Sequence, residues 1–214
     1  MPLPDTSTLA LYMIAALVLL LTPGPAVVYI VARSIDQGRL AGVVSALGIG
    51  VGSLFHITAA AVGVSAVLAA SALAFSAVKY LGAAYLVFLG IRRLFFETTD
   101  TGAQAAPQPR RLSQVFVHGV VVNVLNPKTA LFFFAFLPQF IDPARGPAAV
   151  QIFLLGAIFV AMAIVSDSTY ALFSGTIGNW LRNSQTFLRG QKYVTGSLYV
   201  ALGIGAAVTG PTNK

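Results

Sequence analysis

The chain has 214 residues, of which 57% are hydrophobic and only 9% charged, and its mean hydropathy is +0.84. Soluble domains carry about 25% charged residues, so this composition suits a surface that contacts lipid and excludes an ordinary globular domain. The net charge of +7 comes from basic residues between apolar runs, which is typical of membrane orientation and not of nucleic-acid binding. Because the chain has no cysteine, a disulfide framework and a thiolate metal site are excluded, and we expect no cofactor.

Six apolar stretches follow one another along the chain, and we expect each to cross the bilayer as a helix. They cover residues 7–31, 40–68, 73–96, 115–140, 148–177 and 193–208. The second and fifth stretches are long, so each needs tilt or a non-helical part. No basic segment precedes the first stretch, and we expect it to be a span and not a cleaved signal peptide. The sequence therefore predicts an all-α integral membrane protein with six transmembrane helices.

Basic residues gather in the connections after the first, third and fifth stretches. These connections contain Arg33, Arg39, Arg92, Arg93, Arg110, Arg111, Arg182, Arg189 and Lys192. The opposite side has Arg145 and Lys214. Since basic loops stay in the cytoplasm, we expect these three connections inside and both termini outside. The one real linker, residues 97–113, is then cytoplasmic.

The two halves of the chain resemble each other around a proline. LTPGP at residues 21–25 corresponds to LNPKT at residues 125–129, and IDQGR at 35–39 parallels IDPAR at 141–145. Each half holds three spans, an odd number, so the halves must have opposite orientations. We therefore expect two inverted three-helix repeats, residues 1–96 and 114–214.

Proline removes a backbone donor and clashes with the preceding turn, so we expect the first and fourth helices to be discontinuous. The freed backbone groups cannot face lipid. In secondary transporters built from inverted repeats, such interruptions mark the binding site near the bilayer midplane. A structural kink in each helix is the alternative. The candidate substrate-binding residues are Thr22, Pro23, Gly24, Pro25, Asn126, Pro127 and Lys128.

Several short motifs in order carry a resemblance to a known family. They are TPGP at 22–25, GRLAG at 38–42, GIGVG at 48–52, LGAAYL at 81–86, LGIR at 89–92, NPK at 126–128, LPQF at 137–140, TG at 195–196 and ALG at 201–203. Together they resemble the LysE/RhtB family of bacterial amino-acid exporters over nearly the whole chain. The resemblance implies export of amino acids or related small metabolites across the bacterial cytoplasmic (inner) membrane, by exchange with protons.

Three ionisable side chains inside the apolar stretches are candidates for function. Asp167 costs at least about 2.5–3.5 kcal/mol if unpaired in the membrane, so it should face the interior. We interpret it as a proton carrier or the partner of a substrate ammonium, or alternatively as a neutral acid that holds helices together. His56 either relays protons or is hydrogen-bonded to a neighbouring helix. Lys128 either attracts a substrate carboxylate, pairs with an aspartate such as Asp167 or Asp36, or reaches the membrane interface.

Two further groups of residues have both a structural and a functional interpretation. Asp36 and Arg39, with Asp142 and Arg145, repeat at matching loop positions, where they either cap helices or form a gate that breaks and reforms. Glycines at 48, 50 and 52 allow helices to approach closely, and such faces would permit a homodimer.

The leading hypothesis is a secondary exporter that works by alternating access, with a small-molecule substrate and the lipid bilayer as its partners. An intramembrane enzyme is the alternative, but neither histidine is an obvious partner for Ser174, and His56 and Asp167 are too few for a metal site. A structural membrane assembly protein is a third hypothesis. No P-loop motif occurs, so an ATP-driven pump is not supported.

Overall fold

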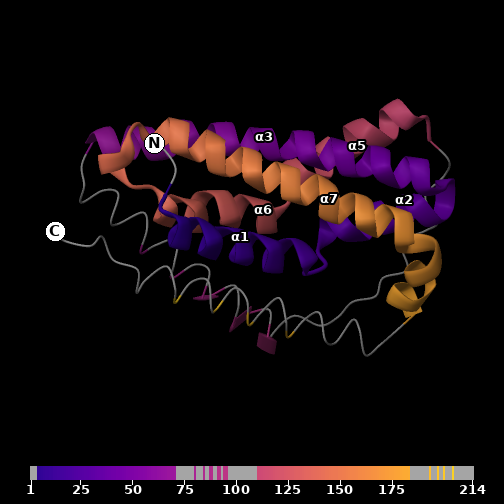
Figure 1. Ribbon diagram of the computed structural model, residues 1–214. Coiled ribbons are helices and arrows are strands. Elements are labelled where there is room, and N and C mark those ends of the chain that lie inside the picture. Colours follow the sequence, from indigo (N-terminus) through magenta and orange to yellow (C-terminus); the bar gives the residue numbers. More distant parts are fainter. Residues whose placement is uncertain are drawn as a thin grey trace.

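The computed structural model describes residues 4–70 and 110–183, with a few single positions between 80 and 204. These ranges contain six α-helices and no strand (Figure 1). The helices are α1 (Thr6–Leu21), α2 (Pro25–Gln37), α3 (Arg39–Ala70), α5 (Leu112–Val124), α6 (Pro127–Leu131) and α7 (Ala148–Asn183). The expected third and sixth spans, and residues 97–109 of the linker, lie mostly outside the described residues.

Both proline-containing segments break their helices. The axes of α1 and α2 meet at 50°, and α5 meets the segment Pro127–Phe140 at 49°. Beyond α6, this segment continues as a π-helical stretch, Phe132–Phe136, and a 3-10 turn, Leu137–Phe140. The predicted discontinuity of the first and fourth helices is confirmed.

The two long apolar stretches form the uninterrupted helices α3 and α7. Both contain segments that are long and apolar enough to cross a membrane, Arg39–Val64 and Ala148–Ser174, and each bent pair can supply one more span. The described residues thus provide two to four candidate spans. The non-helical alternative for the second and fifth stretches is wrong, because neither helix is interrupted.

The helix ends of the first half differ from the sequence prediction. The first apolar stretch was expected to end at residue 31, but α2 continues to Gln37 through a polar last turn. Only Gly38 separates α2 from α3, and its φ of 88° favours glycine. At the other end, Asp5 caps α1 by accepting from Ser7 and Thr8, whose hydrogen bonds hold the pKa of that carboxyl well below its usual range.

Glycines bring α3 into direct backbone contact with α5. A Cβ on Gly48 would lie 2.3 Å from the Phe116 carbonyl oxygen, and one on Gly119 would lie 2.8 Å from the Ser45 carbonyl oxygen. Helix α7 covers another side of α3, where a Cβ on Gly50 would lie 3.2 Å from Ile164. The expected role of the glycines in close helix packing is confirmed.

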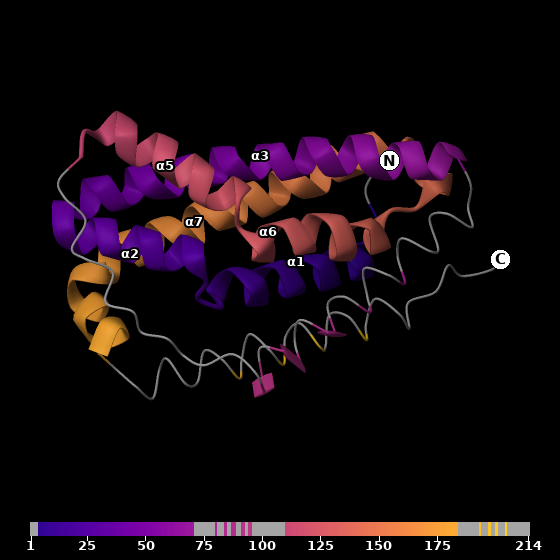
Figure 2. The same ribbon diagram turned by 180° about the vertical axis from the view of Figure 1, so that it is seen from behind.

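A large aromatic cluster joins α1 to the second broken helix. The Tyr12 ring lies 5.8 Å from the Phe132 ring and 5.2 Å from the Phe140 ring, between centroids. Figure 2 shows α1 and α6 lying next to each other below α3. Many large apolar side chains remain on the outside, which suits contact with lipid. They include Leu11, Ile14, Leu21, Leu40, Phe55, Val62, Val165 and Phe173.

Candidate functional site at the two helix breaks

The first break leaves two backbone carbonyl groups without their usual helical donors. Because residue 25 is proline, the Leu21 carbonyl cannot receive the i+4 hydrogen bond, and the Tyr170 hydroxyl donates to it instead at 2.8 Å. Thr22 turns to an extended conformation, and its carbonyl accepts a hydrogen bond from the Lys128 ammonium. Side chains from distant parts of the sequence therefore replace the donors that the break removed.

At the second break, a different set of groups binds the freed carbonyl. Pro127 cannot donate to the Asn123 carbonyl, which accepts instead from the Asn126 N–H at 2.9 Å and from His56 Nε2 at 2.9 Å. The Asn126 side chain caps α6 by accepting from the Lys128 N–H at 3.1 Å. At both breaks, hydrogen bonds thus replace donors that the prolines or the broken geometry removed from the Leu21, Thr22 and Asn123 carbonyls.

The donors cross between the two halves of the chain. His56 lies on α3 in the first half and serves the break in the second half. Tyr170 on α7 and Lys128 on α6 lie in the second half and serve the break in the first half. A change in the position of either half therefore has to exchange these hydrogen bonds.

The remaining predicted binding residues lie around the same contact. Gly24 is extended and precedes Pro25, the first residue of α2, which has no side-chain cap. A Cβ on Gly24 would lie 3.2 Å from Lys128 Cδ, so the lysine stem runs along this glycine. Pro23 lies between Thr22 and Gly24 in the break. The structure thus brings the candidate residues of both breaks together through Lys128.

Asp167 and Lys128 are buried charged groups at this place. Asp167 is 4% exposed and faces the interior, as predicted, while Lys128 is 9% exposed and its ammonium binds the Thr22 carbonyl. They are close enough to interact electrostatically, but no ion pair within 4.0 Å joins them in the described part of the chain. No hydrogen bond links the Asp167 carboxylate to another described residue.

His56 is a fully enclosed side chain. It is 2% exposed, donates to the Asn123 carbonyl and stacks on Phe133 with ring centroids 6.3 Å apart. The predicted hydrogen bond to a neighbouring helix is confirmed. The other ring nitrogen, Nδ1, has no hydrogen-bond partner among the described residues.

Asn123 is a central residue that the sequence prediction missed. Its amide nitrogen donates to the Ile49 carbonyl at 2.7 Å and to the Ser53 hydroxyl at 2.8 Å, and its amide oxygen accepts from the Thr129 hydroxyl at 2.8 Å. The side chain is 1% exposed. A primary amide inside an apolar stretch, three residues before Asn126, was the available signal, because burial of an unsatisfied amide is costly.

The four predicted gating residues lie away from the breaks. Asp142 and Arg145 share one 3-10 turn, where Asp142 accepts from the Ala144 N–H at 2.9 Å and pairs with Arg145 Nε at 3.2 Å. Asp36 lies in the last turn of α2, and Arg39 begins α3. The expectation that both pairs occupy matching loops is wrong for Asp36 and Arg39, because one glycine forms the whole connection.

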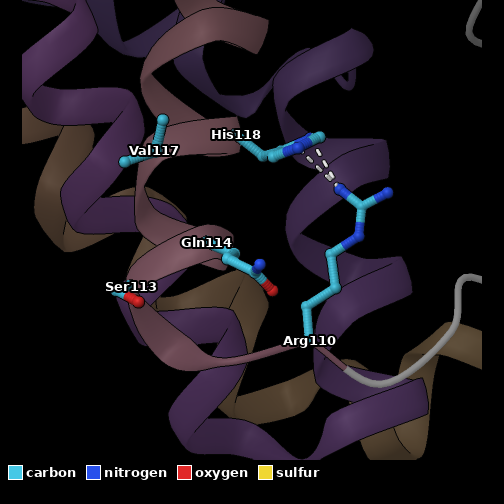
Figure 3. Close-up of a pocket in the computed structure, with 5 residues that line it drawn as sticks. All are labelled: Arg110, Ser113, Gln114, Val117 and His118. Carbon is cyan, nitrogen blue, oxygen red and sulfur yellow. Dashed lines mark hydrogen bonds between the residues drawn. The ribbon is translucent and has the colours of Figure 1, made fainter.

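A pocket of about 360 Å³ lies at the start of α5, whereas the break follows the last turn of that helix. Figure 3 shows Arg110 beside His118, with Arg110 Nη1 2.8 Å from both ring nitrogens. None of the predicted site residues lines it. The lining residues are Arg110, Ser113, Gln114, Val117 and His118. No group of three or more potential metal ligands occurs among the described residues.

Comparison with known proteins decides the family. The family model for LysE type translocators matches residues 17–210. The chain belongs to the LysE type translocator family. It is 32% identical to an uncharacterized membrane protein of Bacillus subtilis, over 92% of this chain and 97% of the relative. It is 31% identical to a homoserine/homoserine lactone efflux protein of Salmonella typhimurium, over 90% of this chain and 92% of the relative. It is 25% identical to a leucine efflux protein of Salmonella choleraesuis, over 88% of this chain and 89% of the relative. No solved structure matches the chain.

Membership of the LysE type translocators confirms the family resemblance drawn from the motifs. It makes the protein a membrane transporter and not an enzyme, which removes the intramembrane protease alternative. The match begins within α1 and covers both breaks, so the polar contacts described above lie inside the family region.

Proposed function

We propose that this LysE type translocator exports amino acids or related small metabolites across the bacterial cytoplasmic membrane as a secondary transporter. The efflux relatives, named for homoserine and leucine, support an amino-acid substrate. The observation that carries the proposal is the buried contact between the Lys128 ammonium and the Thr22 carbonyl, together with the buried Asp167, which interacts electrostatically with Lys128. It joins the two breaks through groups that suit a zwitterion.

The substrate binds between the breaks, against Thr22, Asn126 and the exposed backbone around Pro23, Gly24, Pro25 and Pro127. Lys128 attracts its carboxylate, and the start of α2 favours the same charge because the helix dipole is positive there. Asp167 takes either the substrate ammonium or the coupled proton, and His56 is the second candidate for the proton. These roles agree with burial of both charged groups, which is expensive in a membrane and typical of functional residues there.

Transport proceeds by alternating access between two inverted repeats, residues 1–96 and 114–214, joined by the linker 97–113. The crossed hydrogen bonds support this scheme, because each half supplies donors to the break of the other. Asp36 with Arg39, and Asp142 with Arg145, act as gates by breaking and reforming their charge interactions. The distribution of basic residues supports cytoplasmic loops after spans one, three and five, with both termini outside.

A homodimer is also part of the proposal, but it needs another face than the glycines. Gly48 already contacts α5, and Gly50 contacts α7, within one chain. The exposed apolar side chains of the outer surface are the remaining candidates for a contact between copies.

The experiment that tests the proposal is release of labelled amino acids from cells that overexpress the protein. Cells are loaded with dipeptides of leucine or homoserine, which liberate the amino acid inside. We expect faster release than from cells without the protein, and a return to their rate with Asp167→Asn. Asp5→Asn, at the exposed N-cap of α1, is the matched control. Unchanged accumulation for every amino acid tested would remove the proposed function.

A further inference from the structure

Among the described residues, the Lys128 ammonium has fewer hydrogen-bond acceptors than it has donors. An ammonium group has three donors, but Lys128 has one acceptor for them among the described residues, the Thr22 carbonyl. The side chain is nevertheless nine-tenths buried, with its stem packed along Gly24. Because buried charges are normally fully hydrogen-bonded, this place has unused capacity for polar contacts.

Asp167 provides the complementary unused capacity. Its carboxylate is buried without a hydrogen bond to another described residue, and it interacts electrostatically with both Lys128 and Tyr170. Tyr170 lies three residues further along α7, on the same face, and its hydroxyl donates to the Leu21 carbonyl at 2.8 Å. Asp167 is therefore on the side of α7 that serves the first break.

A purely structural role predicts a different arrangement. A buried lysine and aspartate that only stabilise the fold would be expected to form a direct ion pair, since each compensates the burial of the other. Here the ammonium binds a backbone carbonyl of the break, and no ion pair with Asp167 forms within 4.0 Å in the described part of the chain. Two opposite charges thus interact electrostatically, each incompletely paired within the described part of the chain.

We infer that the Thr22 carbonyl and the Asp167 carboxylate form an ammonium subsite, which Lys128 occupies in this structure and which the substrate's primary ammonium takes over. Lys128 then turns on its flexible stem to the substrate carboxylate. The zwitterion inserts between the Lys128 ammonium and the Asp167 carboxylate. Its own two charges and both side chains then gain hydrogen-bond partners. The inference rests on the proposed function and deepens it, because it specifies a substrate with a free primary ammonium next to a carboxylate.

The test uses a primary ammonium ion as the probe and Lys128→Ala as the variant. Truncation removes the built-in ammonium but leaves the carbonyl and carboxylate. We expect millimolar ethylammonium to raise the melting temperature of purified Lys128→Ala by about 2–4 °C. Tetramethylammonium, which has no N–H donor, should have no effect, and neither should ethylammonium on Lys128→Ala/Asp167→Asn. Equal effects of both ions, or none, would overturn the inference.

A second measurement uses the unmodified protein, so it does not depend on how Lys128→Ala folds. Acetylation of lysines by a succinimidyl ester is followed by mass spectrometry, with Lys79, Lys192 and Lys214 as internal references. Ethylamine itself consumes the ester, so acetylation of Lys128 is expressed relative to the reference lysines. Ethylammonium should raise this relative rate severalfold, because it displaces the side chain from Thr22, while tetramethylammonium should not. An unchanged rate contradicts the subsite.

The two proposals can fail separately. Ammonium-dependent stabilisation without amino-acid release from cells would support the subsite and remove the export function. Amino-acid release from cells, together with no response of Lys128→Ala or of the unmodified protein to ethylammonium, would keep the export function and overturn the subsite.

Discussion

The two helix breaks have the same cause and very different surroundings. At the first break, the freed carbonyls are bound by the ends of two long side chains, Lys128 and Tyr170, and α2 begins without a side-chain cap. At the second break, the short side chains of Asn123 and Asn126 form a buried network with several partners. The adjoining helix α5 also touches α3 backbone to backbone.

This difference suggests two unlike sides of the proposed site. We call the second break, with the network of Asn123 and Asn126, its fixed wall, and the first break, bound by Lys128 and Tyr170, its adaptable wall. Contacts made by short side chains and backbone leave little freedom, so the second break keeps its shape. Contacts made by the tip of a lysine or a tyrosine can be exchanged for contacts with a substrate without repacking a helix. Substrate exchange is therefore expected at the first break, and damage to the second should appear as lost stability. Four predictions test this comparison.

The largest effect is expected where α3 touches α5. In Gly48→Ala, the new methyl group would lie 2.3 Å from the Phe116 carbonyl oxygen, which is part of a helix and cannot move alone. We expect a loss of about 3 kcal/mol in the free energy of unfolding, and a melting temperature lower by about 6–12 °C. Gly63→Ala is the matched control, since no described residue beyond its own helical turn lies within 4 Å of its added carbon. Equal behaviour of the two variants would contradict the fixed wall.

Asn123→Ala should have the next largest effect. It removes the acceptor of the Thr129 hydroxyl and one of the buried partners of the Ser53 hydroxyl and of the Ile49 carbonyl, at a cost of about 2–4 kcal/mol. Thr129→Val removes a single bond of the same network. A double-mutant cycle of the two variants should give a coupling of about 0.5–3 kcal/mol in thermal unfolding. Strictly additive losses would mean that Asn123 does not organise the second break.

The sequence was sufficient for the positions of both breaks, because proline acts on its own helix and its effect is local. Burial of Asp167 was also predictable, since lipid excludes a charge whatever the fold. The residue at which the first broken helix ends was not predictable from the sequence. Hydrophobic periodicity does not detect a polar last turn such as the one that ends at Gln37.

The partners of the site residues required the structure. Lys128 and Thr22 are 106 positions apart, and Tyr170 and Leu21 are 149 apart. From the sequence, the predicted partners of Lys128 were a substrate carboxylate, Asp167 or Asp36, and a backbone carbonyl was not among them. The proline rule states which carbonyls lose their donors, but only the packing of α6 and α7 determines which side chain replaces each donor.

A smaller loss of stability is expected when either of two tyrosines that donate to a backbone carbonyl is replaced by phenylalanine. Tyr170→Phe removes the hydroxyl donor to the Leu21 carbonyl, and Tyr12→Phe removes a donor to the Leu155 carbonyl, each bond being 2.8 Å long. Each variant should lose about 1 kcal/mol in unfolding free energy. Only Tyr170→Phe should change the rate of amino-acid release, because only its bond belongs to the adaptable wall. Equal release rates from both variants would remove Tyr170 from the site.

The smallest stability effect is expected at the turn formed by Asp142 and Arg145. Their ion pair is 3.2 Å long but roughly half exposed, so Arg145→Gln should cost less than about 0.5 kcal/mol. The gating proposal nevertheless expects slower release, because a gate acts through the pair and not through stability. The exchanged variant Asp142→Arg/Arg145→Asp keeps the pair and loses the acidic cap on the Ala144 N–H, so it separates the two roles. Recovery of release in the exchanged variant would assign the function to the pair. Normal release in Arg145→Gln would reduce the turn to a capped connection before α7, and Asp36 with Arg39 would then be the one remaining gate of the proposal.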